Sequence, residues 1–77
     1  MNKIRKSQLK AVMEGLEQLL TQLEELKDEE EEYLDNVPEN LQGTERYLNS
    51  ELALRNMEEA VDSIENAISC ITDIVEE

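Results

Sequence analysis

Apolar residues recur through the first half of the chain at alternating intervals of three and four. The series is made up of Leu9, Val12, Leu16, Leu19, Leu23, Leu26, Tyr33 and Val37, and Glu30 occupies its one polar position. This spacing is the heptad pattern of a helix whose a and d positions pack against another helix. Met13 and Leu20 fall at e and widen the stripe to three columns. Because the remaining residues are mostly good helix formers, the pattern predicts a helix over residues 3–35.

A second series of the same kind follows residue 46. It consists of Tyr47, Ser50, Leu54, Met57, Val61, Ile64, Ile68, Ile71 and Val75. A flanking row at seven-residue intervals is formed by Ala53, Ala60, Ala67 and Ile74. We expect a helix over residues 44–76, capped at its N-terminus by Thr44 or Ser50. The small side chains of the flanking row would let another helix approach closely.

Between the two series, residues 36–43 interrupt the helical pattern. Pro38 has no amide hydrogen and disfavours helical geometry at Val37, and Gly43 is typical of turns and caps. A connection of about eight residues lets the chain reverse, and we expect Leu41 to cover the end of the core from a short helical turn begun by Pro38. The two helices have nearly equal lengths. The sequence therefore predicts a single all-α domain, an antiparallel two-helix hairpin with coiled-coil-like packing.

The apolar stripes are wider than a hairpin can enclose. Each helix covers only part of its neighbour, so a third column of apolar side chains stays in water. We expect a second copy to cover it, giving a homodimer in the form of a four-helix bundle. A hydrophobic groove on another protein is the alternative. The residues expected to mediate self-association are Leu16, Leu20, Leu23, Ile64 and Ile68.

The composition narrows the function classes. The 77 residues include 20 acidic and 7 basic side chains, no His and one Cys, with a formal net charge of -13. Without His and with a single Cys, the usual nucleophile–base pairs and zinc spacings cannot be built, so we expect no enzyme activity, no cofactor and no metal site. No stretch approaches the roughly 20 apolar residues of a membrane span, and the N-terminus lacks a signal-peptide core. We therefore expect a cytoplasmic protein without a membrane partner.

The acidic residues are far more numerous than solubility requires, since a net charge of roughly 2 to 8 suffices for a small domain. A rod of roughly 45 Å carrying these carboxylates would have one per about 2 to 2.5 Å, close to the one charge per about 1.7 Å of duplex DNA. Two interpretations stay open: charge for solubility alone, or recognition of a basic protein that normally binds nucleic acid. The acidic face assigned to that contact consists of Glu24, Glu25, Asp28, Glu29, Glu31, Glu32, Glu58, Glu59, Asp62 and Glu65.

Four of the seven basic residues lie in the first ten positions. They are Lys3, Arg5, Lys6 and Lys10. An antiparallel hairpin places them beside the acids at the other end of the chain, Asp73, Glu76 and Glu77. Their mutual attraction would offset the unfavourable interaction of each group with its own helix dipole. Direct binding to nucleic acid is not expected, because four positive charges are few and the acidic remainder repels phosphate.

The segment Tyr33–Tyr47 (YLDNVPENLQGTERY), preceded by a Glu-rich heptad helix, resembles short Glu-rich helical-hairpin proteins of Gram-positive bacteria and their phages. The resemblance covers most of the chain in pattern and is most specific in this segment. It implies a helical hairpin, encoded by a mobile element or working in the bacterial cytoplasm, and carries over no active site.

Small acidic phage proteins often inhibit nucleases or other defence proteins. The leading hypothesis is therefore a non-enzymatic acidic protein-binding module, a phage-type inhibitor that mimics nucleic acid and blocks the basic surface of a DNA- or RNA-handling protein. The alternative is a structural or adaptor bundle whose apolar stripe binds a partner or a second copy, with acids serving solubility only.

Overall fold

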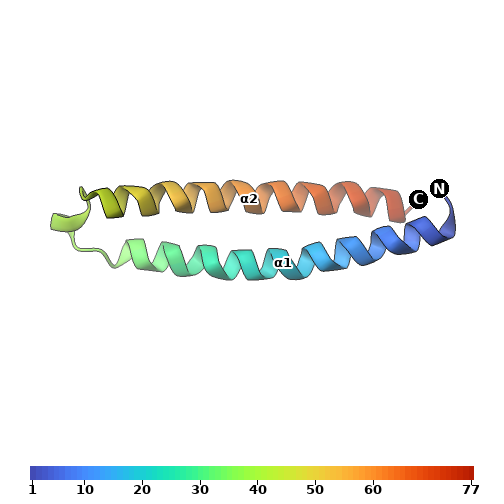
Figure 1. The fold of residues 1–77 in the computed structure, drawn as a ribbon, viewed down its shortest axis with the longest axis horizontal. Helices are drawn as coiled ribbons and strands as arrows, with labels where there is room; N and C mark the ends of the chain where they lie inside the picture. Colours follow the sequence, from blue (N-terminus) through green and yellow to red (C-terminus); the bar gives the residue numbers. More distant parts are fainter.

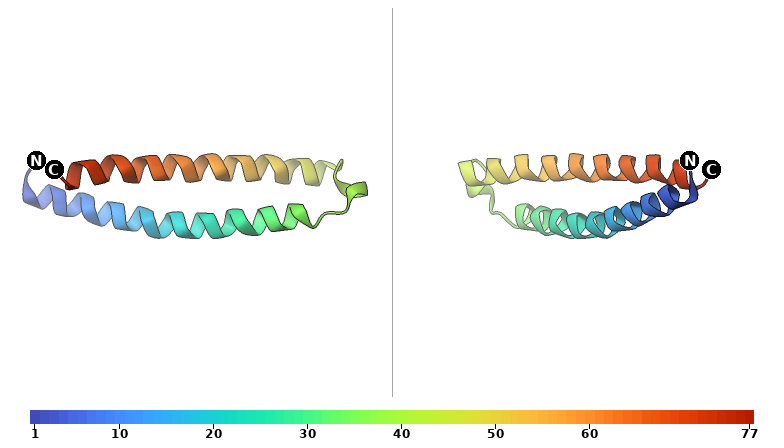
Figure 2. Two further views of the ribbon diagram at one scale, coloured as in Figure 1. Left: turned by 180° about the vertical axis from the view of Figure 1, so that it is seen from behind. Right: turned by 45° about the vertical axis from the view of Figure 1, so that its right-hand side comes forward.

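The computed structural model describes residues 1–77 as two long helices packed antiparallel (Figure 1). Helix α1 spans Lys3–Asp35, a short 3-10 turn η1 spans Glu39–Leu41, and helix α2 spans Glu45–Val75. The two chain termini lie together at one end of the rod, and the turn lies at the other (Figures 1 and 2). The predicted all-α antiparallel hairpin is confirmed, and both helices begin and end within one residue of the expected positions.

Local hydrogen bonds fix where each helix begins. The Asn2 side chain accepts a hydrogen bond of 2.7 Å from the Arg5 amide at the start of α1. The Thr44 hydroxyl oxygen accepts one of 3.3 Å from the Tyr47 amide at the start of α2. These contacts satisfy main-chain donors that have no partner within the helix. Of the two expected candidates, Thr44 is therefore the cap of α2.

The turn is held by main-chain contacts around Pro38. The Leu41 amide donates to the Pro38 carbonyl at 2.9 Å and closes η1, as expected for a short helical turn begun by this proline. The Leu41 carbonyl accepts bonds from both the amide and the hydroxyl of Thr44, which leads the chain directly into α2. The Leu41 side chain is still 46% exposed. It covers the end of the core less completely than we expected, because η1 extends beyond the helices.

The seam between the helices uses different columns of α1 from those predicted. The half-buried or buried positions alternate by three and four and are Lys6, Leu9, Met13, Leu16, Leu20, Leu23, Lys27, Glu30, Leu34 and Val37. These are the a and e columns of the heptad, whereas a and d were expected. The d residues Val12, Leu19, Leu26 and Tyr33 are exposed. Two helices can bury only a two-column strip of a three-column stripe, and here the e column occupies the second place.

The core of the hairpin is thin. Leu34 and Val61 are the only buried side chains. The accessible surface is 5901 Å², whereas a compact folded chain of this mass exposes about 4,800 Å². The Cα radius of gyration is 17.4 Å, against about 11.5 Å for a compact chain of this length. The molecule is a rod that leaves much of its apolar surface in contact with solvent.

Few polar contacts join the two ends of the chain. The Lys6 ammonium donates to the main-chain oxygen of Glu77 at 2.8 Å, and the Thr72 hydroxyl lies 3.0 Å from the Met13 sulfur. No salt bridge forms between the basic first turns of α1 and the acids of α2. The single ion pair of the chain joins Lys27 to Asp28. The expected charge pairing at this end is therefore limited to proximity and one Lys6 contact.

Replacing Leu34, which lies next to the turn, by Ala should lower the free energy of unfolding by about 3 kcal/mol, because it removes one of only two buried side chains in the hairpin. Leu52→Ala is the matched control, since Leu52 is 53% exposed on the other helix, and it should change stability by less than about 0.5 kcal/mol. Urea unfolding followed by circular dichroism measures both. Equal effects of the two substitutions would contradict the seam described above.

Candidate functional site

Four exposed apolar side chains form a line along α1. It consists of Val12, Leu19, Leu26 and Tyr33, which we call the outer row. Their exposed fractions lie between 42% and 58%. Because they are spaced by seven residues, they form a nearly straight line parallel to the helix axis.

A second line runs along α2 on the same side of the hairpin. It consists of Ala53, Ala60, Ala67 and Ile74, all half-buried, which we call the alanine row. Arg46 lies seven residues before Ala53 and lines the same cavity as Tyr33. Leu34 and Arg55 line a different cavity, on the other side of the seam. The outer row and the alanine row therefore border one surface, which we call the open face.

The contacts between the helices fix which parts of the two rows lie level. Lys6 contacts Glu77, and Met13 contacts Thr72. In an antiparallel pair, residues whose numbers add up to between 83 and 85 then lie side by side. Leu19 therefore lies level with the segment just before Ala67.

The residues predicted to mediate self-association lie in the seam between the helices and not on the open face. Leu16, Leu20, Leu23, Ile64 and Ile68 are all half-buried along the seam between α1 and α2. The more exposed apolar surface belongs to the outer row, which the sequence reasoning assigned to the seam. The composition of the columns could not have revealed this, because the e column includes Lys6 and Lys27 and is less apolar than the d column from Val12 to Tyr33, so it favours d for the seam.

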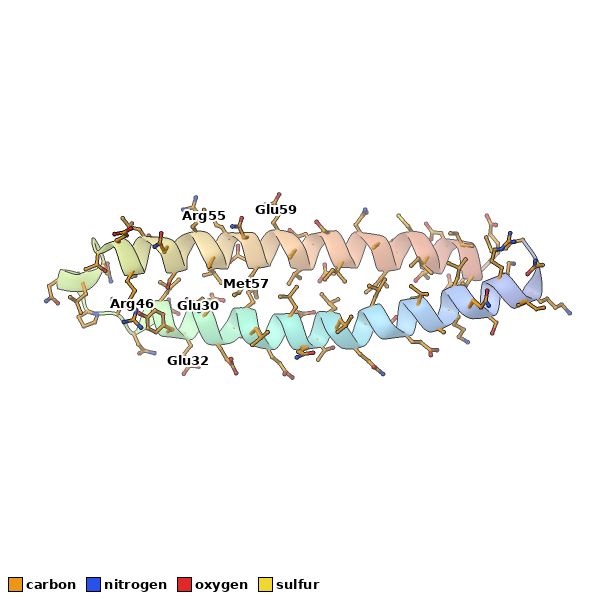
Figure 3. All side chains as sticks on the ribbon, viewed as in Figure 1. Glu30, Glu32, Arg46, Arg55, Met57 and Glu59 are labelled. Carbon is orange, nitrogen blue, oxygen red and sulfur yellow. The ribbon has the colours of Figure 1, made fainter.

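A cavity of about 820 Å³ lies at the turn end of the open face. Its lining residues are Glu29, Glu32, Tyr33, Asn36, Val37, Pro38, Leu41, Thr44, Arg46 and Tyr47. Arg46 reaches from the first turn of α2 toward the C-terminal end of α1 (Figure 3). The site combines an apolar, partly aromatic lining with carboxylates from Glu29 and Glu32.

The ten carboxylates predicted as a partner-binding surface are all exposed. Glu32 and Glu59 point away from the neighbouring helix (Figure 3). Only Asp28 is within salt-bridge distance of a basic group, the ammonium of Lys27 at 3.6 Å. The structure thus leaves nearly all of these charges without an intramolecular partner.

The charges are distributed very unevenly along the rod. The half nearer the turn, residues 20–63, holds 14 acidic and 3 basic residues, a net charge of -11. The remaining residues, at the terminal end, hold 6 acidic and 4 basic residues, a net charge of -2. One end of the hairpin is therefore strongly anionic and the other is nearly balanced.

The linear charge density is lower than the sequence led us to expect. The rod extends over 59 Å, so its 20 carboxylates are spaced at about one per 3 Å. The expected value used helix length alone and omitted the turn, which adds to the length of the rod. A single hairpin therefore carries clearly less charge per length than duplex DNA, with one charge per about 1.7 Å.

Other kinds of site have little support in the side-chain arrangement. No three or more His, Cys, Asp or Glu side chains are arranged to hold a metal ion. Neither helix contains a segment that is long and apolar enough to cross a membrane. Cys70 is an exposed thiol. The chain matches no protein-family model, and no curated protein or solved structure is significantly similar to it.

Repulsion among the closely spaced carboxylates of α1 should be measurable as lost helix stability. Asp28 and Glu32 are four residues apart, and Glu32→Lys replaces this repulsion by an attractive pair of favourable orientation. We expect stability in 10 mM NaCl to rise by about 0.5 to 1 kcal/mol. The gain should largely disappear in 0.5 M NaCl because salt screens exposed charges. Thermal unfolding at both concentrations tests this, and an unchanged midpoint at low salt would contradict it.

Proposed function

We propose that this chain is a non-enzymatic, acidic protein-binding module that self-associates and competes with nucleic acid for the basic surface of a DNA- or RNA-handling protein. The observation that carries the proposal is the concentration of exposed carboxylates without intramolecular partners on one end of a rigid rod. The resemblance to hairpin proteins of bacteria and phages favours an inhibitor of a host defence protein in the bacterial cytoplasm.

The mechanism follows from charge and shape alone. Carboxylates on α1 and α2 would occupy the lysine and arginine positions that otherwise contact phosphates. Because the helices hold the acids at fixed spacing, the partner can meet many of them at once without ordering a flexible chain. The anionic turn end would also attract a basic partner from a distance and accelerate encounter. No covalent step, cofactor or metal is involved.

Self-association strengthens the likeness to nucleic acid. Two hairpins side by side would carry twice the net charge of -13 over nearly the same 59 Å. That is about one net charge per 2.3 Å, against one net charge per about 4.5 Å for a single hairpin, and it is closer to the roughly 1.7 Å of duplex DNA. The homodimer is therefore the form that we expect to compete with DNA or RNA.

A second candidate function is favoured by the outer row. In this interpretation the protein is a structural or adaptor bundle, its open apolar face binds another protein, and the acids only keep the rod soluble. Exposure of 58% at Leu19 and 48% at Leu26 gives such a partner an apolar line to contact. The two candidates differ in which surface the partner needs.

The acidic candidate is tested by neutralising carboxylates at one end of the rod. The variant is Glu25→Gln, Asp28→Asn, Glu29→Gln and Glu32→Gln. The matched control removes the same charge from the terminal half and is Glu14→Gln, Glu17→Gln, Asp73→Asn and Glu76→Gln. The binding partner is a protein captured from bacterial lysate at 50 mM NaCl. The first set should raise the dissociation constant for this partner about thirtyfold, since each of the four exposed contacts contributes roughly 0.5 kcal/mol. The control should raise it less than threefold.

Binding of the captured protein is measured by titration, with duplex DNA or RNA added as competitor. Release by nucleic acid and loss of affinity between 50 and 500 mM NaCl support the proposal. A partner whose affinity is the same at both salt concentrations, or that binds DNA and this protein simultaneously, contradicts it.

The apolar surface is tested by Leu19→Glu combined with Leu26→Glu. These side chains are exposed, so the hairpin should keep its helical circular dichroism, whereas charges at the seam residues Leu23 and Ile64 would unfold it. We expect the mass from light scattering to fall from twice 8.9 kDa to 8.9 kDa. The control, Leu48→Glu with Leu52→Glu, changes two equally exposed residues on α2 and should leave the mass unchanged.

Partner binding by the same double variant separates the two candidates. Complete loss of binding at low salt, with the hairpin folded, would favour the adaptor. Retained but weaker binding that still depends on salt is the result expected of the acidic module.

A further inference from the structure

We propose that two copies associate through their open faces in opposite directions, so that the turn end of each hairpin lies over the terminal end of the other. This rests on the self-association proposed above and adds its face, its direction and its register.

The aliphatic part of the outer row and the alanine row have nearly the same midpoint. Leu19 is the central aliphatic residue of the outer row, with Val12 and Leu26 seven residues to either side, and Tyr33 lies one heptad beyond Leu26. The centre of the alanine row falls between Ala60 and Ala67. Leu19 lies level with the segment just before Ala67. The two centres therefore have the same position along the rod axis to within one helical turn. A two-fold axis that passes through this level, parallel to the open face and perpendicular to the rod, therefore places each row against the same row of the partner.

This axis produces a self-complementary set of contacts. On α1, Leu19 meets the partner's Leu19, and Val12 meets the partner's Leu26. On α2, Ala60 meets the partner's Ala67, and the small side chains let the two helices approach closely. At the ends of the alanine row, the large Ile74 faces the partner's small Ala53. The two aliphatic rows on α1 therefore pack against each other, and the two alanine rows on α2 do the same.

The open face is large enough for a stable dimer. The rod measures 59 × 14 × 14 Å between Cα extremes, so one long face covers about 830 Å². A specific protein–protein interface of standard size buries roughly 800 Å² on each partner. A second copy also supplies an apolar surface of the same length and spacing.

The uneven charge of the rod favours the opposite direction of the two hairpins in the dimer. If the hairpins pointed the same way, the two halves with a net charge of -11 would lie against each other, as would the two halves with -2. In the opposite orientation each strongly acidic half lies against a nearly balanced one. Like-charge repulsion disfavours the first arrangement, and the basic first turns of α1 favour the second.

The turn cavity fits the terminal end of the second copy. Arg5 lies seven residues before Val12 and extends the outer row, at the same distance from Leu19 as Tyr33. The axis therefore places Arg5 over the partner's Tyr33, beside the cavity carboxylates of Glu29 and Glu32. A guanidinium suits both an aromatic face and carboxylates. The neighbouring Ile4, 74% exposed in one hairpin, lies next to the apolar lining.

Disulfide cross-linking tests the direction and the register. In a Cys70→Ser background, Leu19→Cys puts two thiols on the two-fold axis, within the roughly 7 Å between Cα atoms that a disulfide requires. Under mild oxidation this variant should link into a covalent dimer. Val12→Cys should not, because its two copies lie about 21 Å apart, fourteen residues along the helices. The double variant Val12→Cys with Leu26→Cys should link fully, which shows that the Val12 position is reactive.

Leu52→Cys is the control for random collision, since Leu52 and Val12 are each 53% exposed. Linking of Leu19→Cys at least tenfold faster than both Leu52→Cys and Val12→Cys supports the proposed arrangement. Arg5→Glu should raise the dissociation constant of the reduced dimer about tenfold, because two exposed contacts are lost at up to about 1 kcal/mol each.

Failures of the two proposals are distinguishable by the mass of the reduced protein. A mass of 8.9 kDa at all concentrations would contradict self-association, and the open face would then be available to another protein. Twice that mass without Leu19→Cys linking, or with Val12→Cys linking equally fast, keeps the dimer and overturns the opposite orientation. Loss of nucleic-acid competition in a correctly linked dimer would contradict the acidic function and leave the arrangement intact.

Discussion

The structure depends on a geometric limit: a helix can bury only a strip about two columns wide against one neighbour. Helix α1 carries three apolar columns, so one of them stays outside whenever α2 is its only partner. The hairpin buries a and e and leaves the outer row in solvent. The e column is the less apolar choice, since it includes Lys6 and Lys27. Lys27 fits because its alkyl chain can lie along the seam while its ammonium stays near Asp28. The wholly apolar column remains available for a second surface, and the thin core gives the single rod little other burial.

Much of this fold is readable from the sequence because its determinants are local. Pro38 and Thr44 set the turn and the start of α2 through their own main-chain and hydroxyl chemistry, which does not depend on distant contacts. The choice between columns d and e is different, because both lie beside column a and both contain apolar residues. It depends on how far each helix rotates about its axis to fit α2, where Ala60 and Ala67 flank one side of the seam. Periodicity shows the width of a stripe but not its rotation, and the open face was therefore missed. The ten acidic positions were found exposed because charged side chains without partners have no other stable location.

The distribution of charge has consequences that the total of -13 does not show. A uniformly acidic rod would repel a second copy equally in every orientation. Here the basic residues at the start of α1 reduce the charge of one end, so repulsion depends on direction. The same residues oppose the dipole of their own helix, which costs stability within a single hairpin. Only Lys6 makes a polar contact there, with the last residue of the chain. Placement against the anionic half of a second hairpin gives Arg5 and its neighbours a favourable environment that the single hairpin lacks.

The apolar and acidic surfaces are linked, because covering the apolar face with a second copy produces the carboxylate density that a basic partner would bind. Bringing two rods together concentrates carboxylates, which raises the resemblance to a nucleic acid backbone and also raises the repulsion between the copies. Apolar burial is short-ranged and insensitive to moderate salt, whereas the repulsion is screened over about 8 Å at physiological ionic strength. Salt should therefore strengthen the association of the rods and weaken their hold on a basic partner. A basic partner can itself act as the screen, since its positive side chains neutralise the crowded carboxylates and stabilise the dimer that it binds. Association and partner binding are then thermodynamically coupled, and each increases the affinity of the other.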